Sequence, residues 1–190
     1  MPITAKELME KLAKDKDYQK RARKKKAKIR EAAAKLDKEY KPFSRECKRA
    51  RHSVKTAWDL LPVKKPYPEL MPILMKYLEE KNHSPRFRDG VARAMAVPEA
   101  SPYFDRILAQ YYDAKDEHET VRWAIALAIC KSARTQEQLD VVEQMIYDEK
   151  VGNDRNALLG AIKRMKGEQK KRCLAYVNDT EALRINLHSR

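Results

Sequence analysis

The feature that most constrains the fold is an internal repeat in the last two-thirds of the chain. Each repeated segment contains an arginine followed by apolar residues at +3, +4 and +7, which is the spacing of one helix face. A period near 33 residues predicts an array of similar structural units. The segments begin at Ser84, Glu117 and Gly152, and their arginines are Arg88, Arg122 and Arg155.

A second amphipathic helix precedes each repeated segment. Ser84 and Ser101 each stand before a proline, which favours an N-cap followed by proline at the first helical position. Gly is rare and Ala, Leu, Lys, Glu and Arg are abundant, so the composition favours helix over sheet. The preceding helices are expected at residues 70–78, 103–111, 139–146 and 174–177, the last followed by a truncated partner around 183–187.

Paired helices at this period, with an arginine early in the second helix, resemble HEAT repeats of the armadillo-like class over residues 67–190. A generic α–α solenoid is the alternative. The resemblance implies an all-α, right-handed α–α superhelix of three to four helix pairs, whose second helices line a concave surface that binds protein or nucleic acid. It also implies that Arg88, Arg122 and Arg155 form a structural ladder between repeats. Candidate partner contacts are polar residues that interrupt the apolar stripe, namely Arg93, Asn156, Lys163 and Arg164.

The front third is organised differently. Pro42 predicts a break or kink, and the apolar spacing from Phe43 to Leu61 then predicts a helix of about five turns. PVKKPYP predicts an extended connector, because each proline disfavours helix at the residue before it. The predicted parts are a basic helical region that caps the stack (1–61), the connector (62–68) and the repeats (67–190).

Positive charge is concentrated in that front third. Residues 1–65 hold 22 Lys and Arg against nine Asp and Glu, whereas residues 66–190 hold 20 against 19. In KRARKKKAKIR, residues 20–30, apolar residues do not recur at the spacing of one helix face. A helix there is therefore expected to be exposed, frayed or ordered by a partner. Its cations are Lys20, Arg21, Arg23, Lys24, Lys25, Lys26, Lys28 and Arg30.

Like charges at i,i+4 within this segment repel each other, which favours an anionic ligand. Nucleic acid, an acidic protein, an anionic membrane surface and an import receptor all fit, and the alternative is a solvated helix that maintains solubility. No sequence pattern of a particular nucleic-acid-binding fold accompanies it, and no aromatic residues are interleaved for stacking.

Other chemistry has weaker support. Cys47, Cys130 and Cys173 have no CxxC spacing, so we expect buried thiols rather than disulfides or a zinc site. Some HEAT-like DNA glycosylases hold alkylated bases between Trp and Asp residues. Here Trp58 and Trp123 lie on apolar helices, which predicts core positions. Phosphate-binding glycine loops, HExxH and GxSxG are absent from the sequence.

The sequence therefore predicts a non-enzymatic macromolecule-binding module or scaffold that binds a protein partner and requires no metal or cofactor. The alternatives are nucleic-acid binding through residues 20–30 and, more remotely, an alkylpurine DNA glycosylase. No membrane span or signal peptide is expected, which predicts a cytoplasmic protein, or a nuclear one in a eukaryote. The oligomeric state stays open, since an uncapped last repeat would favour an end-to-end dimer.

Overall fold

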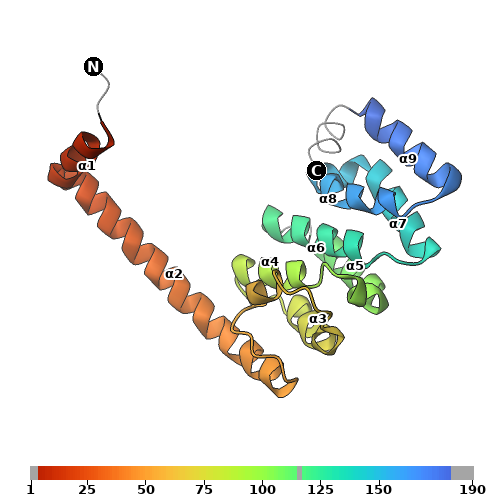
Figure 1. The fold of residues 1–190 in the computed structure, drawn as a ribbon, viewed down its shortest axis with the longest axis horizontal. Helices are drawn as coiled ribbons and strands as arrows, with labels where there is room; N and C mark the ends of the chain where they lie inside the picture. Colours follow the sequence, from red (N-terminus) through yellow and green to blue (C-terminus); the bar gives the residue numbers. More distant parts are fainter. Residues whose placement is uncertain (1–3, 115–116, 181–190) are drawn as a thin grey trace. The chain divides into compact units, whose positions relative to one another are not determined.

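The computed structural model describes residues 4–114 and 117–180, and within those ranges the chain forms α-helices and 3-10 helices and no strand (Figure 1). The all-α prediction is thereby confirmed for this part of the chain. No helix of the described part is long and apolar enough to cross a bilayer, in agreement with the sequence. The truncated helix predicted around 183–187 lies outside the described residues.

The chain divides into two compact units, residues 1–39 and 40–190. The first unit contains α1 (Ala5–Lys14) and most of α2 (Lys16–Arg49), which continues past the boundary. Asp15 separates the two helices and its Oδ1 accepts a hydrogen bond from the Tyr18 backbone N–H at 2.9 Å. This is N-cap geometry, which explains why α2 begins there.

The last turns of α2 belong to the second unit and bury Tyr40, Phe43 and Cys47. The helix continues through Pro42, so the predicted break at this proline is wrong. It ends at Arg49, where Arg51 adopts a left-handed φ of 65° and the His52 N–H donates to the Cys47 carbonyl. These are the features of a Schellman-type helix stop.

The helix predicted from Phe43 to Leu61 is therefore wrong beyond Arg49. The apolar spacing is buried only in part. Phe43, Cys47 and Ala57 are buried, Ala57 on a separate 3-10 helix, η1 (Ala57–Leu60), whereas Leu61 at the end of the predicted helix is 44% exposed. The Asp59 carboxylate accepts hydrogen bonds from the Lys55 and Thr56 backbone N–H groups and fixes the start of η1. The boundary between the two units lies before Tyr40, earlier than the connector at 62–68 that the sequence suggests.

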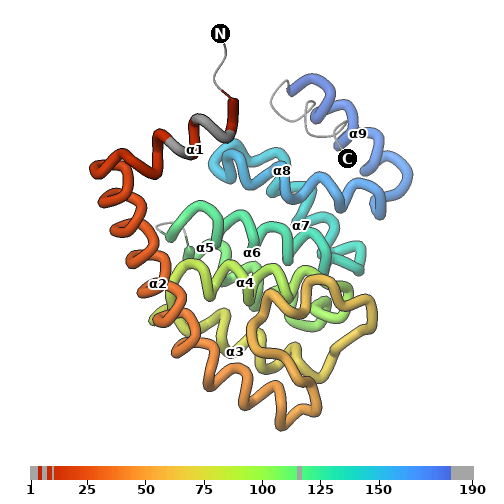
Figure 2. Tube along the Cα trace, turned by 60° about the vertical axis from the view of Figure 1, so that its left-hand side comes forward, coloured from red at the N-terminus to blue at the C-terminus, as the bar shows by residue number. Residues whose placement is uncertain are grey.

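The rest of the second unit is a succession of helices connected by short loops. Helix α4 packs against α6, and α6 packs against α8, while α3 contacts α5 and α7 contacts α9 (Figure 2). In each successive pair of helices we call the earlier one the first helix and the later one the second helix. The first helices are η2 (Pro68–Leu70) with α3 (Met71–Glu79), η3 (Pro98–Tyr103) with α5 (Phe104–Asp113), α7 (Gln136–Tyr147) and α9 (Gly167–Asp179). The second helices are α4 (Pro85–Ala94), α6 (Glu119–Ser132) and the short α8 (Arg155–Leu158) between η4 (Glu149–Asp154) and η5 (Leu159–Lys163).

An aromatic cluster joins the end of α2 to the first helix pair. The Phe43 ring lies 5.5 Å from Tyr77 and 6.2 Å from Phe87 in edge-on geometry, and Tyr40 lies 4.5 Å from Phe87. Aromatic pairs in such arrangements contribute about 1 kcal/mol each beyond their buried area. The cluster explains why residues 40–49 belong to the second unit. All three cysteines are buried and free, as predicted.

Beside this cluster, the Glu46 carboxylate accepts hydrogen bonds from Lys76 Nζ at 2.7 Å and Tyr77 Oη at 3.0 Å. The Lys76 hydrogen bond holds the pKa of Glu46 below its usual 4.5. A carboxyl with a lowered folded pKa stabilises the native state above its unfolded pKa, and this contribution is lost as the pH falls through the folded pKa. The contact therefore favours folding at neutral pH.

We expect Glu46→Gln to lower the free energy of unfolding at neutral pH by roughly 0.5–1 kcal/mol, since the ion pair is partly exposed. The difference from wild type should vanish at pH values well below 4.5. Urea denaturation over a pH series measures both quantities. Glu31→Gln, which removes an exposed i,i+4 pair with Lys35, is the control and should change stability little. A difference that persists at acid pH would contradict the assignment.

Candidate functional site

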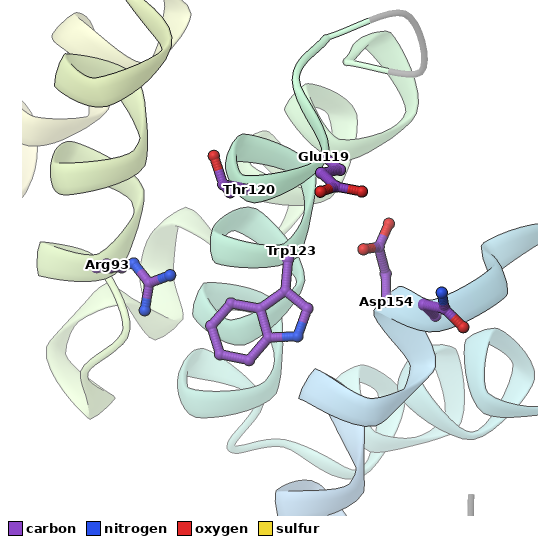
Figure 3. A pocket seen from close by; sticks show the side chains of 6 residues that line it. Arg93, Glu119, Thr120, Trp123 and Asp154 are labelled. Carbon is purple, nitrogen blue, oxygen red and sulfur yellow. The ribbon is translucent and has the colours of Figure 1, made fainter. Parts of the chain in front are cut away.

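A pocket of about 230 Å³ opens on the side of the second helices (Figure 3). Its lining comes from α4, from the first turns of α6 and from the end of η4, so three consecutive helix pairs contribute to it. The pocket forms where α4 and α8 each pack against α6. The lining residues are Arg93, Glu119, Thr120, Trp123, Asn153 and Asp154.

The sequence of α6 explains why Trp123 faces this pocket. Val121, Ala124 and Ile125 are fully buried and occupy the face of α6 that packs against its neighbours. Trp123 lies off that stripe, three and four residues after Thr120 and Glu119, which places all three on one face. The indole is therefore partly exposed and forms a wall of the pocket.

Arg93 forms a second wall and is held in place. Its guanidinium lies 4.9 Å from the centre of the Trp123 ring and 5.9 Å from that of Trp58, which are cation–π distances. Its Nε donates to Asp89 Oδ1 at 2.7 Å, so its charge is neutralised on α4 itself. Arg93 also lines an adjoining groove of about 260 Å³ that includes Leu60, Tyr67 and Leu127.

Asp154 closes the opposite side of the pocket and is 8% exposed. Its Oδ2 accepts a hydrogen bond from Tyr111 Oη at 3.0 Å and forms an ion pair with Arg122 Nη2 at 3.0 Å. Burial raises the pKa of Asp154, the Tyr111 and Arg122 contacts oppose that rise, and the charge of Glu119 adds to it. The carboxylates of Glu119 and Asp154 point toward one another beside the Trp123 ring (Figure 3).

The three repeated arginines each contact a residue that lies later in the chain. Arg88 is 2% exposed, donates from Nη1 to the Leu78 and Glu80 carbonyls at 2.8 Å, and pairs with Glu117 at 2.9 Å. Arg122 reaches Asp154, as above, and Arg155 donates from Nη1 to Tyr176 Oη at 3.1 Å. Each side chain is thus engaged in contacts between helices.

The four candidate partner contacts are not brought together. Arg93 lines the pocket, whereas Asn156 is partly buried on α8 and Lys163 is exposed at the end of η5. Arg164 donates to the carbonyls of Cys130 and Ala133 at the carboxyl end of α6. Its guanidinium is therefore engaged in capping α6, and its contact with a partner stays a prediction.

The two tryptophans also differ from the prediction. The sequence predicts core positions for both, and both are partly exposed beside Arg93. Among the residues that line the pocket, the sequence pattern predicts a partner contact only for Arg93, and it does not predict one for Glu119, Thr120, Asn153 or Asp154. The sequence feature that could have indicated the pocket is the position of Trp123, which follows Arg122 directly and falls outside the +3, +4 and +7 stripe.

The eight cations of the basic segment lie on α2 in the first unit and are all exposed. Arg21 Nε donates to the Asp17 carbonyl at 3.4 Å. Among the residues that the structure describes, none of these eight side chains pairs with a carboxylate. Their charge is therefore available to an external anion.

Metal and thiol chemistry find no support in the described part of the chain. It contains no group of three or more His, Cys, Asp and Glu side chains placed to hold a metal ion. Burial raises the pKa of the Cys47 thiol to about 12, which keeps it protonated and unreactive. Comparison with protein-family models, curated proteins and solved structures finds no match to this chain.

The contacts of Arg88 lead to a stability prediction. Arg88→Met should lower the free energy of unfolding by roughly 3 kcal/mol, because Glu117 loses its partner and two carbonyls at the end of α3 lose their donor. Arg155→Met, at the equivalent and more exposed repeat position, should cost under about 1 kcal/mol. Chemical denaturation followed by far-UV circular dichroism compares the two, and equal losses would contradict the burial argument.

Proposed function

We propose that this chain is a non-enzymatic protein-binding module, built as a HEAT-like α-solenoid whose second helices present the binding surface. The observation that carries the proposal is the pocket that three consecutive second-helix regions form together. Supporting it, α4, α6 and α8 contact one another in succession, as stacked repeats do. An aromatic side chain in a concave site is the type of anchor that dominates protein interfaces.

The charges of the pocket favour a basic side chain from the partner. Arg93 is neutralised by Asp89 and Arg122 by Asp154, and Glu119 has no ion pair among the described residues. A lysine or arginine that enters beside Trp123 would relieve the repulsion between Glu119 and Asp154 and contact the indole ring. The pocket is thus suited to a cationic group presented by another protein.

A polyanion fits this face poorly. Residues 66–190 are nearly neutral overall, with 20 Lys and Arg against 19 Asp and Glu. A phosphate backbone drawn across the pocket would approach the carboxylates of Glu119 and Asp154, and like-charge contacts of this kind suppress binding. Protein is therefore the favoured ligand of the second-helix face.

Site-specific photo-crosslinking tests the proposal. A photoreactive amino acid at Thr120, at the pocket rim, should capture one discrete protein from an extract of the source cells. The same amino acid at Ala109, an exposed position on α5, is the matched control and should not capture it. Trp123→Ala should reduce the Thr120 crosslink at least tenfold, since interface anchors are worth about 2 kcal/mol or more. Equal capture at both positions, or capture unaffected by Trp123→Ala, would count against the proposal.

A catalytic alternative rests on one specific observation, the meeting of Trp123 with the carboxylates of Glu119 and Asp154 in one pocket. Similar combinations hold alkylated bases in HEAT-like DNA glycosylases. Incubation of the full chain with alkylated duplex DNA decides this question. Release of a modified base that Asp154→Asn abolishes would replace the binding module with an enzyme, and an intact substrate would exclude this activity.

A further inference from the structure

The cations of the basic segment, residues 20–30, have an arrangement around the axis of α2 that the composition does not show. From Lys20 to Arg30 the backbone is one uninterrupted stretch of α-helix, so successive side chains are separated by about 100° around the axis. Arg21, Lys24 and Lys28 then lie within about 60° of one another and form one row along the helix. Arg23, Lys26 and Arg30 have the same i, i+3, i+7 spacing and form a second row, about 160° away from the first.

The segment thus presents two parallel rows of three cations on nearly opposite sides of one helix. Lys20 and Lys25 lie outside the two rows, each nearer the first, and all eight side chains are exposed. The segment contains no acidic residue, and its i,i+4 neighbours repel each other by a few tenths of a kcal/mol per pair. An anion that reaches both rows at once would remove this repulsion.

The placement of the rows discriminates between kinds of anion. A flat surface, such as a bilayer or one face of an acidic protein, contacts about half of a helix and leaves one row in water. A membrane-bound helix also needs a broad apolar face, and the non-cationic residues here are Ala22, Ala27 and Ile29. A single strand would need aromatic side chains for stacking, and the segment has none.

A groove between two phosphate strands satisfies both rows. The major groove of B-form DNA is about 12 Å wide and admits an α-helix, whose diameter with side chains is about 10–12 Å. The major groove of A-form RNA is deep and narrow and excludes a helix. We propose that α2 binds the major groove of duplex DNA through residues 20–30, with the Arg21, Lys24 and Lys28 row facing one phosphate strand and the Arg23, Lys26 and Arg30 row facing the other.

Such binding has little sequence specificity. Lysine and arginine side chains directed at phosphates fix position without specifying bases, and the remaining side chains of the segment are two alanines and one isoleucine. The inference is independent of the proposed protein-binding surface, since it uses no residue of the second unit.

Fluorescence anisotropy of the full chain with a short random-sequence DNA duplex over a salt series tests the inference. With up to eight phosphates neutralised, the plot of log affinity against log salt should have a slope of up to about −7. Two matched triple variants follow, Arg21→Gln with Lys24→Gln and Lys28→Gln, and Arg23→Gln with Lys26→Gln and Arg30→Gln. Each should reduce the slope by about 3 and weaken binding to a similar extent, because each row has its own strand.

Glutamine is a good helix former, and circular dichroism checks that both variants keep the wild-type helix content. Duplex RNA should bind at least tenfold more weakly than duplex DNA. The inference is overturned if DNA does not bind near physiological salt, if one triple variant accounts for the loss, or if RNA binds as tightly. Tighter binding to anionic lipid vesicles or to polyglutamate would likewise overturn it and assign the segment to a membrane or an acidic protein.

Discussion

The second unit depends on side-chain contacts between helices that are separated along the chain, and those of Arg88 are the clearest. A guanidinium that is 2% exposed is costly to bury unless its donors are matched. The Leu78 and Glu80 carbonyls satisfy two of them at the open end of α3, and Glu117 supplies the charge from the chain that leads into α6. One side chain thus fixes the end of one helix and the approach to a later one.

Arg122 makes similar contacts in the next helix pair, and these contacts position one wall of the pocket. Because Arg122 and Tyr111 hold one oxygen of Asp154, the Asp154 carboxylate is fixed beside Trp123 rather than free to leave the site. Arg93 is fixed in the same way by Asp89. The walls of the pocket are therefore ordered before any ligand arrives, which lowers the entropic cost of binding.

Helix pairing in the second unit could be predicted from the sequence because periodic burial leaves a periodic pattern. The +3, +4 and +7 positions after Arg88 and Arg122 are buried on α4 and α6, as expected for one packed face. Periodicity also gave a wrong prediction, since Phe43, Cys47 and Ala57 keep helical spacing and are buried although the helix stops at Arg49. The apolar spacing does not show where a helix stops, because the left-handed conformation of Arg51 is a property of the backbone that the pattern does not contain.

The pocket was harder to predict because its residues come from three segments that are distant in the sequence. The apolar character of its helix predicts a core position for Trp123, whereas its angular position places it on the opposite side of the helix from Ile125. Angular position also carries the most information in α2. Composition gives eight cations in eleven residues, but the choice among a surface, a strand and a groove depends on their distribution into two rows. In both units, therefore, the helix backbone fixes the direction in which each side chain points, and that direction determines what each surface can bind.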